Sequence, residues 1–246
     1  MSFLSNLFKA KPFIKDLGVL GVDFHSHFLH GIDDGAEQLN QSIEMIGAMQ
    51  EYGFRKLITT PHIMGDYYKN SAETILPKLL EVQSALQLSG LTIQLEAAAE
   101  YYCDEMLLKK VENDEIMSFS SKYVLLELSF INPTDFFDVI TFNLQMNGYK
   151  IILAHPERYS YWHQSIDKLQ AIKDKGVFLQ LNLGALVGQY GSGVKRVAER
   201  LIEEEMIDFV GSDAHKIEHI VSLEKLFNNH YFSKLISSGR LLNSTL

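Results

Sequence analysis

Seven short apolar segments alternate along the chain with stretches whose apolar residues recur at helical spacing, and this alternation restricts the possible folds more than any other feature. The apolar segments, which we predict to be strands, span 19–24, 55–60, 91–98, 123–128, 149–154, 177–182 and 207–211. Helices are predicted at 37–52, 71–89, 104–111, 133–146, 165–175 and 192–205, with a helical tail after the last strand. Pro77 predicts a break or a late start in the second helix. Strands that alternate strictly with helices predict an α/β fold with a parallel sheet, open or closed.

The length and composition of the chain fit one large domain. The 246 residues are 46% hydrophobic, which is enough for a sizeable core, and α/β barrels of this length are ordinary. We predict a single domain at 19–246 and a surface extension at 1–18. The extension lacks the long apolar core of a signal peptide, and no apolar stretch is long enough to span a bilayer.

Charge and cysteine content exclude several classes of function. The net charge is −9, from 22 basic and 31 acidic residues, and no basic run is present, which argues against nucleic acid as a partner. Cys103 is the only cysteine, so neither an intrachain disulfide nor a thiolate metal cluster can form. Both properties are typical of a protein from a reducing compartment, and we expect a cytoplasmic location.

Histidine and carboxylate side chains follow one predicted strand after another. His25 and His27 end the first strand, and their i, i+2 spacing directs both imidazoles to the same side. The other members of this set are His62, Glu100, Glu127, His155, Asp213 and His215. The carboxyl ends of parallel strands meet at one edge, where active sites of such folds lie. The remaining histidines, interpreted as structural or exposed, are His30, His163, His219 and His230.

Two interpretations of these side chains are open. Each histidine alone could be a buried residue satisfied by a hydrogen bond, but a whole set of polar residues at strand ends favours a shared metal site, because buried charge is costly unless paired or metal-bound. Imidazole and carboxylate ligands without thiolate suit Zn, Mn or Fe. Eight candidate ligands exceed the needs of one ion, so we predict two or three ions, an arrangement that hydrolyses phosphate esters in other proteins.

Several motifs resemble the PHP (polymerase and histidinol phosphatase) superfamily of metal-dependent phosphoesterases. The matching stretches, between about residues 20 and 220, are DFHSHFLHGIDDGA, TTPH, AAAEYY, LLELS, LAHPERY and GSDAH. Within the superfamily they are most similar to the capsule-type bacterial protein tyrosine phosphatases, CpsB/CapC-like. The resemblance implies a distorted (β/α)7 barrel of the PHP type. It also implies hydrolysis of phosphotyrosine in the regulation of capsular or extracellular polysaccharide synthesis, with the tail of a bacterial tyrosine kinase as the substrate.

The resemblance further implies which residues bind metal. It implies two or three ions, with Mn expected and Fe or Zn as alternatives, and Glu100 bridging the first two. The ligands, ion by ion, are His25, His27, Glu100 and Asp213; Glu100, Glu127 and His155; and Asp34, His62 and His215. Asp33 is the alternative to Asp34. A homo-oligomer is compatible with this class.

Arg158 corresponds to the phosphate-binding arginine of these phosphatases. With His155 and Asp213 it completes the catalytic residues that the resemblance implies, because a guanidinium fork matches two phosphate oxygens and keeps its charge. Many of these enzymes have a second arginine a few residues past SDxH, and this chain has none there. Lys216 or His219 is the substitute that we expect.

Three other functions remain open at this point. The same site could serve another phosphoesterase, such as a histidinol phosphatase. An amidohydrolase-like C–N hydrolase usually needs a carbamylated lysine, and no lysine ends a predicted strand. A non-catalytic metal-binding protein is the third. Aromatic residues that follow the strand ends either line a groove for a phosphotyrosine ring or pack loops: Tyr67, Tyr68, Tyr101, Tyr102, Tyr159, Tyr161 and Trp162.

Overall fold

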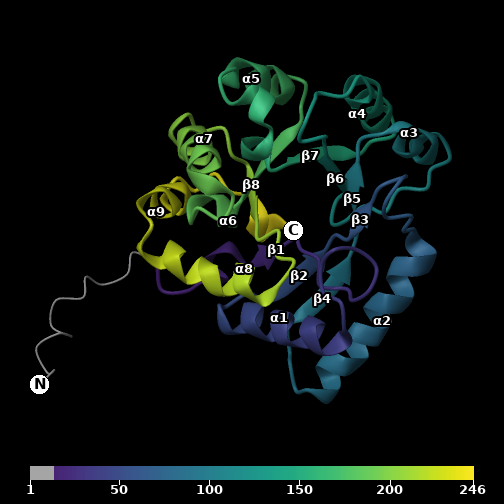
Figure 1. The fold of residues 1–246 in the computed structure, drawn as a ribbon, viewed down its shortest axis with the longest axis vertical. Helices are drawn as coiled ribbons and strands as arrows, with labels where there is room; N and C mark the ends of the chain where they lie inside the picture. Colours follow the sequence, from purple (N-terminus) through teal and green to yellow (C-terminus); the bar gives the residue numbers. More distant parts are fainter. Residues whose placement is uncertain (1–13) are drawn as a thin grey trace, which may run out of the picture.

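The computed structural model describes residues 14–246, and its strands lie at the centre of the molecule with helices around them (Figure 1). Every strand pairs in parallel. One sheet has the order β1 (Val22–Asp23), β2 (Lys56–Thr59) and β4 (Gln94–Ala97). The other has the order β3 (His62–Ile63), β5 (Glu100–Tyr102), β6 (Tyr123–Glu127), β7 (Lys150–Ala154), β8 (Phe178–Asn182) and β9 (Phe209–Gly211).

The distortion of this β/α arrangement comes from two interrupted strands. The predicted strand at 55–60 is β2, and after Thr60-Pro61 the chain enters the other sheet as β3. The predicted strand at 91–98 is likewise divided into β4 and β5. Proline lacks the N–H that a ladder needs, which explains the first interruption. The parallel α/β prediction is confirmed, with seven predicted segments appearing as nine strands in the described part of the chain.

The prediction is wrong for the first half of the first strand. Leu17–Leu20 form a 3-10 helix (η1), which Asp16 caps by accepting a hydrogen bond from the N–H of Gly18. Gly21 then turns the chain with a φ of 76°, a value that favours glycine, so β1 begins only at Val22. Apolar runs of this length do not distinguish a buried helical turn from a strand.

Helices follow the strands as predicted, with two differences. They are α1 (Leu39–Glu51), α2 (Ala72–Leu88), α3 (Glu105–Glu112), α4 (Phe136–Met146), α5 (Ile166–Asp174), α6 (Leu183–Leu186), α7 (Gly191–Glu203), α8 (Ile217–Ser222) and α9 (His230–Ser237). The short α6 was not predicted, and the break at Pro77 is wrong because α2 is continuous there. Pro77 has no N–H, so the carbonyl of Glu73 lacks its usual hydrogen bond within the helix. Both residues are exposed, so water can bond to this carbonyl instead.

The ends of the first and last strand segments lie side by side. The N–H of Asp213 donates to the carbonyl of His25 at 2.8 Å, and the N–H of His27 donates to Ala214 at 3.0 Å. Asn243, in the C-terminal 3-10 turn η5 (Asn243–Thr245), donates from its side-chain amide to carbonyls of both β1 and β9. These contacts hold the DFHSH and SDAH motifs against each other.

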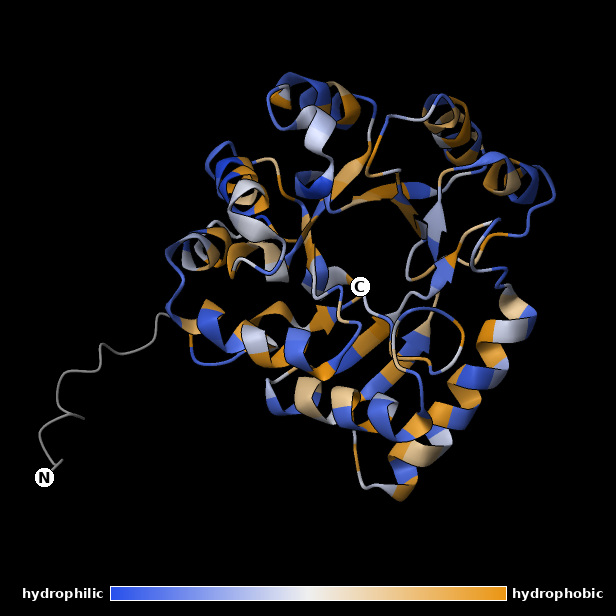
Figure 2. Cartoon of the chain, in the orientation of Figure 1, coloured by the Kyte–Doolittle hydropathy of each residue, from blue (hydrophilic) through white to orange (hydrophobic). Residues whose placement is uncertain are grey.

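Side chains alternate between two cores along the central strands. One face packs against the helices, whose apolar sides point inward (Figure 2). The other face forms a smaller interior cluster that includes Ala98, Leu125 and Phe178. Because strand side chains alternate with a period of two, Glu100 and Glu127 take the next positions on this interior face. The interior therefore changes from apolar to polar at the carboxyl ends of the strands.

The predicted N-terminal extension is described only from residue 14; its first 13 residues lie outside the described part. Ile14 donates its N–H to the carbonyl of Phe227, and Leu17 is fully buried. None of the helices between residues 14 and 246 combines the length and apolar character needed to cross a membrane.

Candidate metal centre

Glu100 is fully buried and lies at the centre of a cluster of buried histidines. Its Oε2 lies 3.2 Å from Nε2 of His25 and 3.1 Å from Nδ1 of His62. Its Oε1 lies 3.1 Å from Nε2 of His155. Glu127 extends the cluster on the same side, with its Oε1 3.5 Å from Nε2 of His155. Residues of β3, β5 and β6 thus meet residues that follow β1 and β7, as the strand ends predicted.

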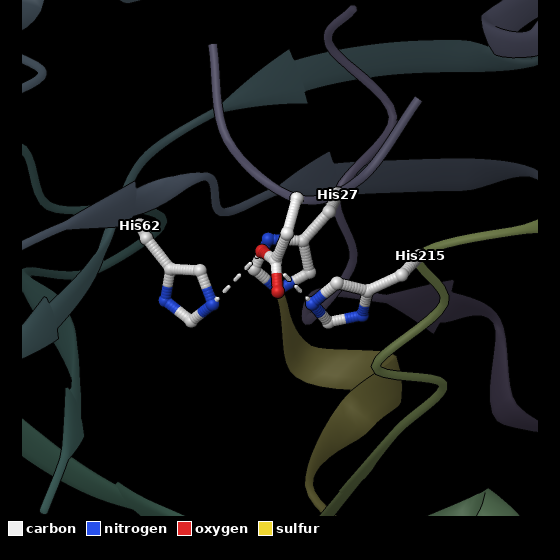
Figure 3. Close-up of side chains that lie close together, drawn as sticks. His27, His62 and His215 are labelled. Carbon is white, nitrogen blue, oxygen red and sulfur yellow. Dashed lines mark ion pairs between the residues drawn. The ribbon is translucent and has the colours of Figure 1, made fainter. Parts of the chain in front are cut away.

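Asp213 and Asp34 complete the cluster from the other side. Oδ1 of Asp213 lies 3.5 Å from Nε2 of His27 and 3.4 Å from Nδ1 of His215. Oδ1 of Asp34 lies 3.5 Å from Nε2 of His62 and 3.4 Å from Nε2 of His215. Figure 3 shows the rings of His27, His62 and His215 converging around a carboxylate.

Several buried polar atoms of the cluster lack a hydrogen-bond partner among the described residues. Four of them are Nε2 of His25, Nε2 of His27, Nδ1 of His62 and Oε2 of Glu100. Leaving such atoms unsatisfied costs about 1–3 kcal/mol each. All four face the centre of the cluster, where one or more cations could satisfy them together.

The charges of the cluster also favour the binding of cations. Burial raises the pKa of Glu127 well above its ordinary value, and the neighbouring charges of Glu100 and Asp213 raise it further. Burial would raise the pKa of Glu100 as well, but the charges of His25 and His62 hold it well below its ordinary value. Carboxylates crowded in this way stay ionised together only when positive charge lies between them. Divalent cations would supply that charge and displace protons from the imidazoles.

The residues fit a multinuclear metal site. Their donor atoms form four overlapping groups in which all atoms lie within 4.8 Å of one another. The groups are His25, His27 and Asp213; His25, Glu100 and His155; His62, Glu100 and Glu127; and His27, Asp34, His62 and His215. Every ligand implied by the resemblance belongs to at least one group, and the assignment of ligands to ions remains a prediction.

We therefore expect at least two metal ions per chain. Elemental analysis of the purified protein should show them, because the four donor groups together contain more ligands than one ion can bind. Asp34→Asn should remove at most one ion, since Asp34 is half exposed and pairs only with His62 and His215 among the described residues. A single ion at full occupancy in the parent protein would contradict the multinuclear assignment.

Asp33 orients a ligand instead of facing the centre. Its Oδ2 lies 2.7 Å from Nδ1 of His27 and accepts the N–H of His62, while its Oδ1 accepts the N–H of Gly35. A proton on Nδ1 of His27 leaves Nε2 free for the cluster. This arrangement supports Asp34, rather than Asp33, as the metal ligand of the DDG segment.

Gln180 and Asn182 of β8 orient two further ligands, and the sequence analysis missed both. Oε1 of Gln180 lies 2.8 Å from Nδ1 of His25, so Nε2 of His25 faces the centre. Nε2 of Gln180 donates to Asn182, and Nδ2 of Asn182 donates to Oδ2 of Asp213 at 2.6 Å. Polar residues at i and i+2 within the otherwise apolar segment VFLQLN were the signal that could have identified them.

The backbone is strained or tightly packed at several site residues. His155 and Asp213 have φ values of 34° and 49°, in the left-handed region, which costs a residue with a side chain about 1–3 kcal/mol. A Cβ on Gly35 would lie 2.2 Å from the carbonyl oxygen of His27, and one on Gly211 would lie 2.6 Å from Cβ of His25. Glycine at both positions thus allows His27 to lie close to residue 35 and His25 to lie close to residue 211.

A cavity of about 760 Å³ opens over the cluster and contains Arg158. Nη1 of Arg158 donates to Oδ2 of Asp213 at 3.1 Å, which places the guanidinium beside the candidate ligands. Lys216 and His219, the expected substitutes for a second arginine, both line the cavity. Nδ1 of His219 accepts the N–H of His215, which places this histidine beside a candidate ligand.

Most of the aromatic residues that follow the strand ends pack against loops. The hydroxyl of Tyr101 accepts the N–H of Met117, and that of Tyr159 accepts the N–H of Leu128. Of the set, Tyr68 lines the cavity, and its ring stacks against His62. The other aromatic walls are Phe130 and Tyr190.

Comparisons with known proteins show which family and which relatives the chain is similar to. A sequence model of the family described as capsular polysaccharide synthesis, CpsB/CapC, matches residues 21–225. The chain is 28% identical to a putative tyrosine-protein phosphatase CapC of Staphylococcus aureus, with 90% of each chain covered. It is 29% identical to the tyrosine-protein phosphatase YwqE of Bacillus subtilis, covering 90% of this chain and 91% of YwqE.

Solved structures agree with the fold. Structures described as YwqE from Bacillus subtilis and CpsB from Streptococcus pneumoniae, unique metal-dependent tyrosine phosphatases, match with a TM-score of 0.77 and 28% identity, covering 91% of this chain and 94% of theirs. An amidohydrolase from Mycoplasma synoviae matches with a TM-score of 0.53 and 14% identity, covering 96% of this chain and 88% of its own. The second similarity concerns the fold alone.

Proposed function

The chain belongs to the CpsB/CapC family of capsular polysaccharide synthesis, and we propose that it is a metal-dependent phosphatase that hydrolyses phosphotyrosine in proteins. The observation that carries the proposal is that Arg158 lines the same cavity as five residues of the donor groups, Asp34, His62, Glu127, Asp213 and His215. The relatives named tyrosine-protein phosphatases cover nine-tenths of this chain, and the related solved structures are described as metal-dependent.

We propose manganese as the metal, with two or three ions and with iron or zinc as alternatives. The ligands are those of the sequence analysis, and imidazole with carboxylate is a donor set that suits all three metals. When bound, such ions lower the pKa of water and neutralise phosphoryl oxygens.

Arg158 binds the phosphoryl group in this proposal. Its guanidinium presents a fork of donors that matches two phosphate oxygens, and its charge does not depend on pH. Phenolate is a good leaving group, so the reaction needs little help from a general acid. Phe130 and Tyr68 line the cavity, where the ring of a phosphotyrosine side chain would have apolar contacts.

The biological setting is also a proposal. A phosphotyrosine protein, such as the tail of a bacterial tyrosine kinase, is the substrate, and regulation of capsular or extracellular polysaccharide synthesis is the outcome. A cytoplasmic location fits, because tyrosine kinases take their phosphate from ATP. A homo-oligomer is compatible with this role.

Turnover of a phosphotyrosine peptide tests the proposed activity. With added Mn²⁺ the purified protein should hydrolyse the peptide and p-nitrophenyl phosphate, and a chelator should abolish both reactions. Histidinol phosphate should be a much poorer substrate. If histidinol phosphate is preferred, the phosphoesterase site is correct and the proposed substrate is wrong; if no phosphate ester is hydrolysed, the non-catalytic interpretation applies.

Cys103→Ala provides the control against a thiol mechanism. Cys103 is buried, and burial raises the pKa of its thiol far above the ordinary value, so no thiolate is available as a nucleophile. The variant should keep near-normal turnover. Loss of activity in Cys103→Ala, together with resistance of the parent protein to chelators, would show a thiol phosphatase instead.

A further inference from the structure

Asp213 uses its two carboxylate oxygens differently. Oδ1 faces the imidazoles of the cluster. Oδ2 accepts hydrogen bonds from Asn182 at 2.6 Å, from the hydroxyl of Tyr190 at 3.0 Å and from Arg158 at 3.1 Å. Three donors on one oxygen leave Oδ1 as the atom available to a cation. Oδ2 is also the point where the candidate metal site meets the phosphate-binding arginine.

Arg158 lies over two aromatic rings. The centre of its guanidinium is 4.3 Å from the ring centroid of Phe130 and 4.5 Å from that of Tyr190. A cation over two ring faces gains cation–π attraction from each of them. The rings also restrict the movement of the long side chain, which reduces the conformational entropy lost when phosphate binds.

Tyr190 contacts both Asp213 and Arg158. It precedes α7, and its ring lies against the guanidinium while its hydroxyl donates a hydrogen bond to Asp213. If Arg158 turns its Nη1 from Asp213 to a phosphate oxygen, Oδ2 loses one of its three donors. The hydroxyl of Tyr190 and the amide of Asn182 would remain, so the buried carboxylate would not become unpaired.

We propose that Tyr190 is a positioning residue with two separable roles, its hydroxyl fixing Asp213 for the metal and its ring fixing Arg158 for the phosphate. The proposal rests on the proposed phosphatase function and deepens it. The competing interpretation is that Tyr190 only packs the turn between α6 and α7. The two interpretations predict different results. If Tyr190 only packed this turn, its ring and its hydroxyl would not affect metal affinity and phosphate affinity separately.

The test compares Tyr190→Phe, Phe130→Leu and Tyr190→Leu in the full chain. Mn²⁺ affinity is measured by calorimetry on the apo protein, and the affinity for inorganic phosphate is measured by calorimetry on the Mn-loaded protein. Tyr190→Phe should weaken Mn²⁺ binding about tenfold, as loss of a partner that orients a ligand does, and leave phosphate affinity within about twofold. Phe130→Leu should weaken phosphate binding about three- to tenfold, with Mn²⁺ affinity unchanged. Tyr190→Leu should show both effects.

Tyr161→Phe is the matched control. Its hydroxyl donates to the backbone carbonyl of Ser129, outside the cluster, so neither affinity should change. The proposal is overturned if Tyr190→Phe keeps the Mn²⁺ affinity of the parent, or if all three variants shift only the melting temperature. A parent protein that binds Mn²⁺ and phosphate but does not hydrolyse phosphotyrosine would refute the proposed activity and leave the two roles of Tyr190 intact. A parent that binds neither would refute both.

Discussion

Glu100→Gln is expected to reduce turnover of a phosphotyrosine peptide at least a hundredfold and to lower the metal content by at least one ion. Glu100 is fully buried, and its two oxygens contact His25, His62 and His155. An amide keeps the shape but removes the charge and replaces one oxygen by a donor. Loss of a residue that hydrogen-bonds to a metal ligand typically costs about 10–100-fold in metal affinity or activity. Loss of a ligand at the centre of the site should therefore cost more.

Glu157→Gln is the matched control for this prediction. Glu157 is equally buried, and its Oε1 accepts the N–H of Asn182, but it belongs to none of the donor groups. Burial raises the pKa of its carboxyl to about 8, so it is already mostly neutral at pH 7 and an amide should replace it at little cost. Elemental analysis and turnover distinguish the two variants. If Glu100→Gln keeps the metal content and the rate of the parent, Glu100 is not a bridging ligand.

The parallel fold was predictable from the sequence because its signals are local. Apolar strands separated by helical periodicity determine the layer arrangement, and His25 and His62 follow their strands where the pattern predicts. The division of two strands between the sheets was not predictable. Pro61 marks one interruption, but Ala98 and Ala99 carry no comparable signal, and only pairing with distant strands determines that break.

The site was predictable in its residue types and not in its connections. Strand ends converge, so His155 and Asp213 could be placed at one edge from the sequence. Which carboxylate oxygen faces the metal depends on side-chain torsions and on partners from other segments. Tyr190 lies 23 residues from Asp213 in the chain, and nothing in its neighbourhood indicates that its hydroxyl reaches that carboxylate. The same holds for Phe130 and the guanidinium.

Arg158→Ala is expected to cut turnover of p-nitrophenyl phosphate and of a phosphotyrosine peptide about a hundredfold or more. Loss of a donor that strengthens toward the transition state typically costs about 2–4 kcal/mol. Metal content and melting temperature should stay close to those of the parent, because Asp213 keeps its hydrogen bonds from Asn182 and Tyr190. Steady-state kinetics with elemental analysis on the same preparation measures both.

Arg158→Lys separates geometry from charge at this position. Lysine keeps the positive charge, but an ammonium group cannot give the two parallel hydrogen bonds of the guanidinium fork, and it lacks the planar group that lies over the rings of Phe130 and Tyr190. The lysine variant should therefore recover little of the lost rate. The opposing interpretation is that Arg158 only forms an ion pair with Asp213. Under that interpretation Arg158→Ala would turn over at the parent rate with its metals retained, and phosphate recognition would have to lie at Lys216 or His219 across the cavity.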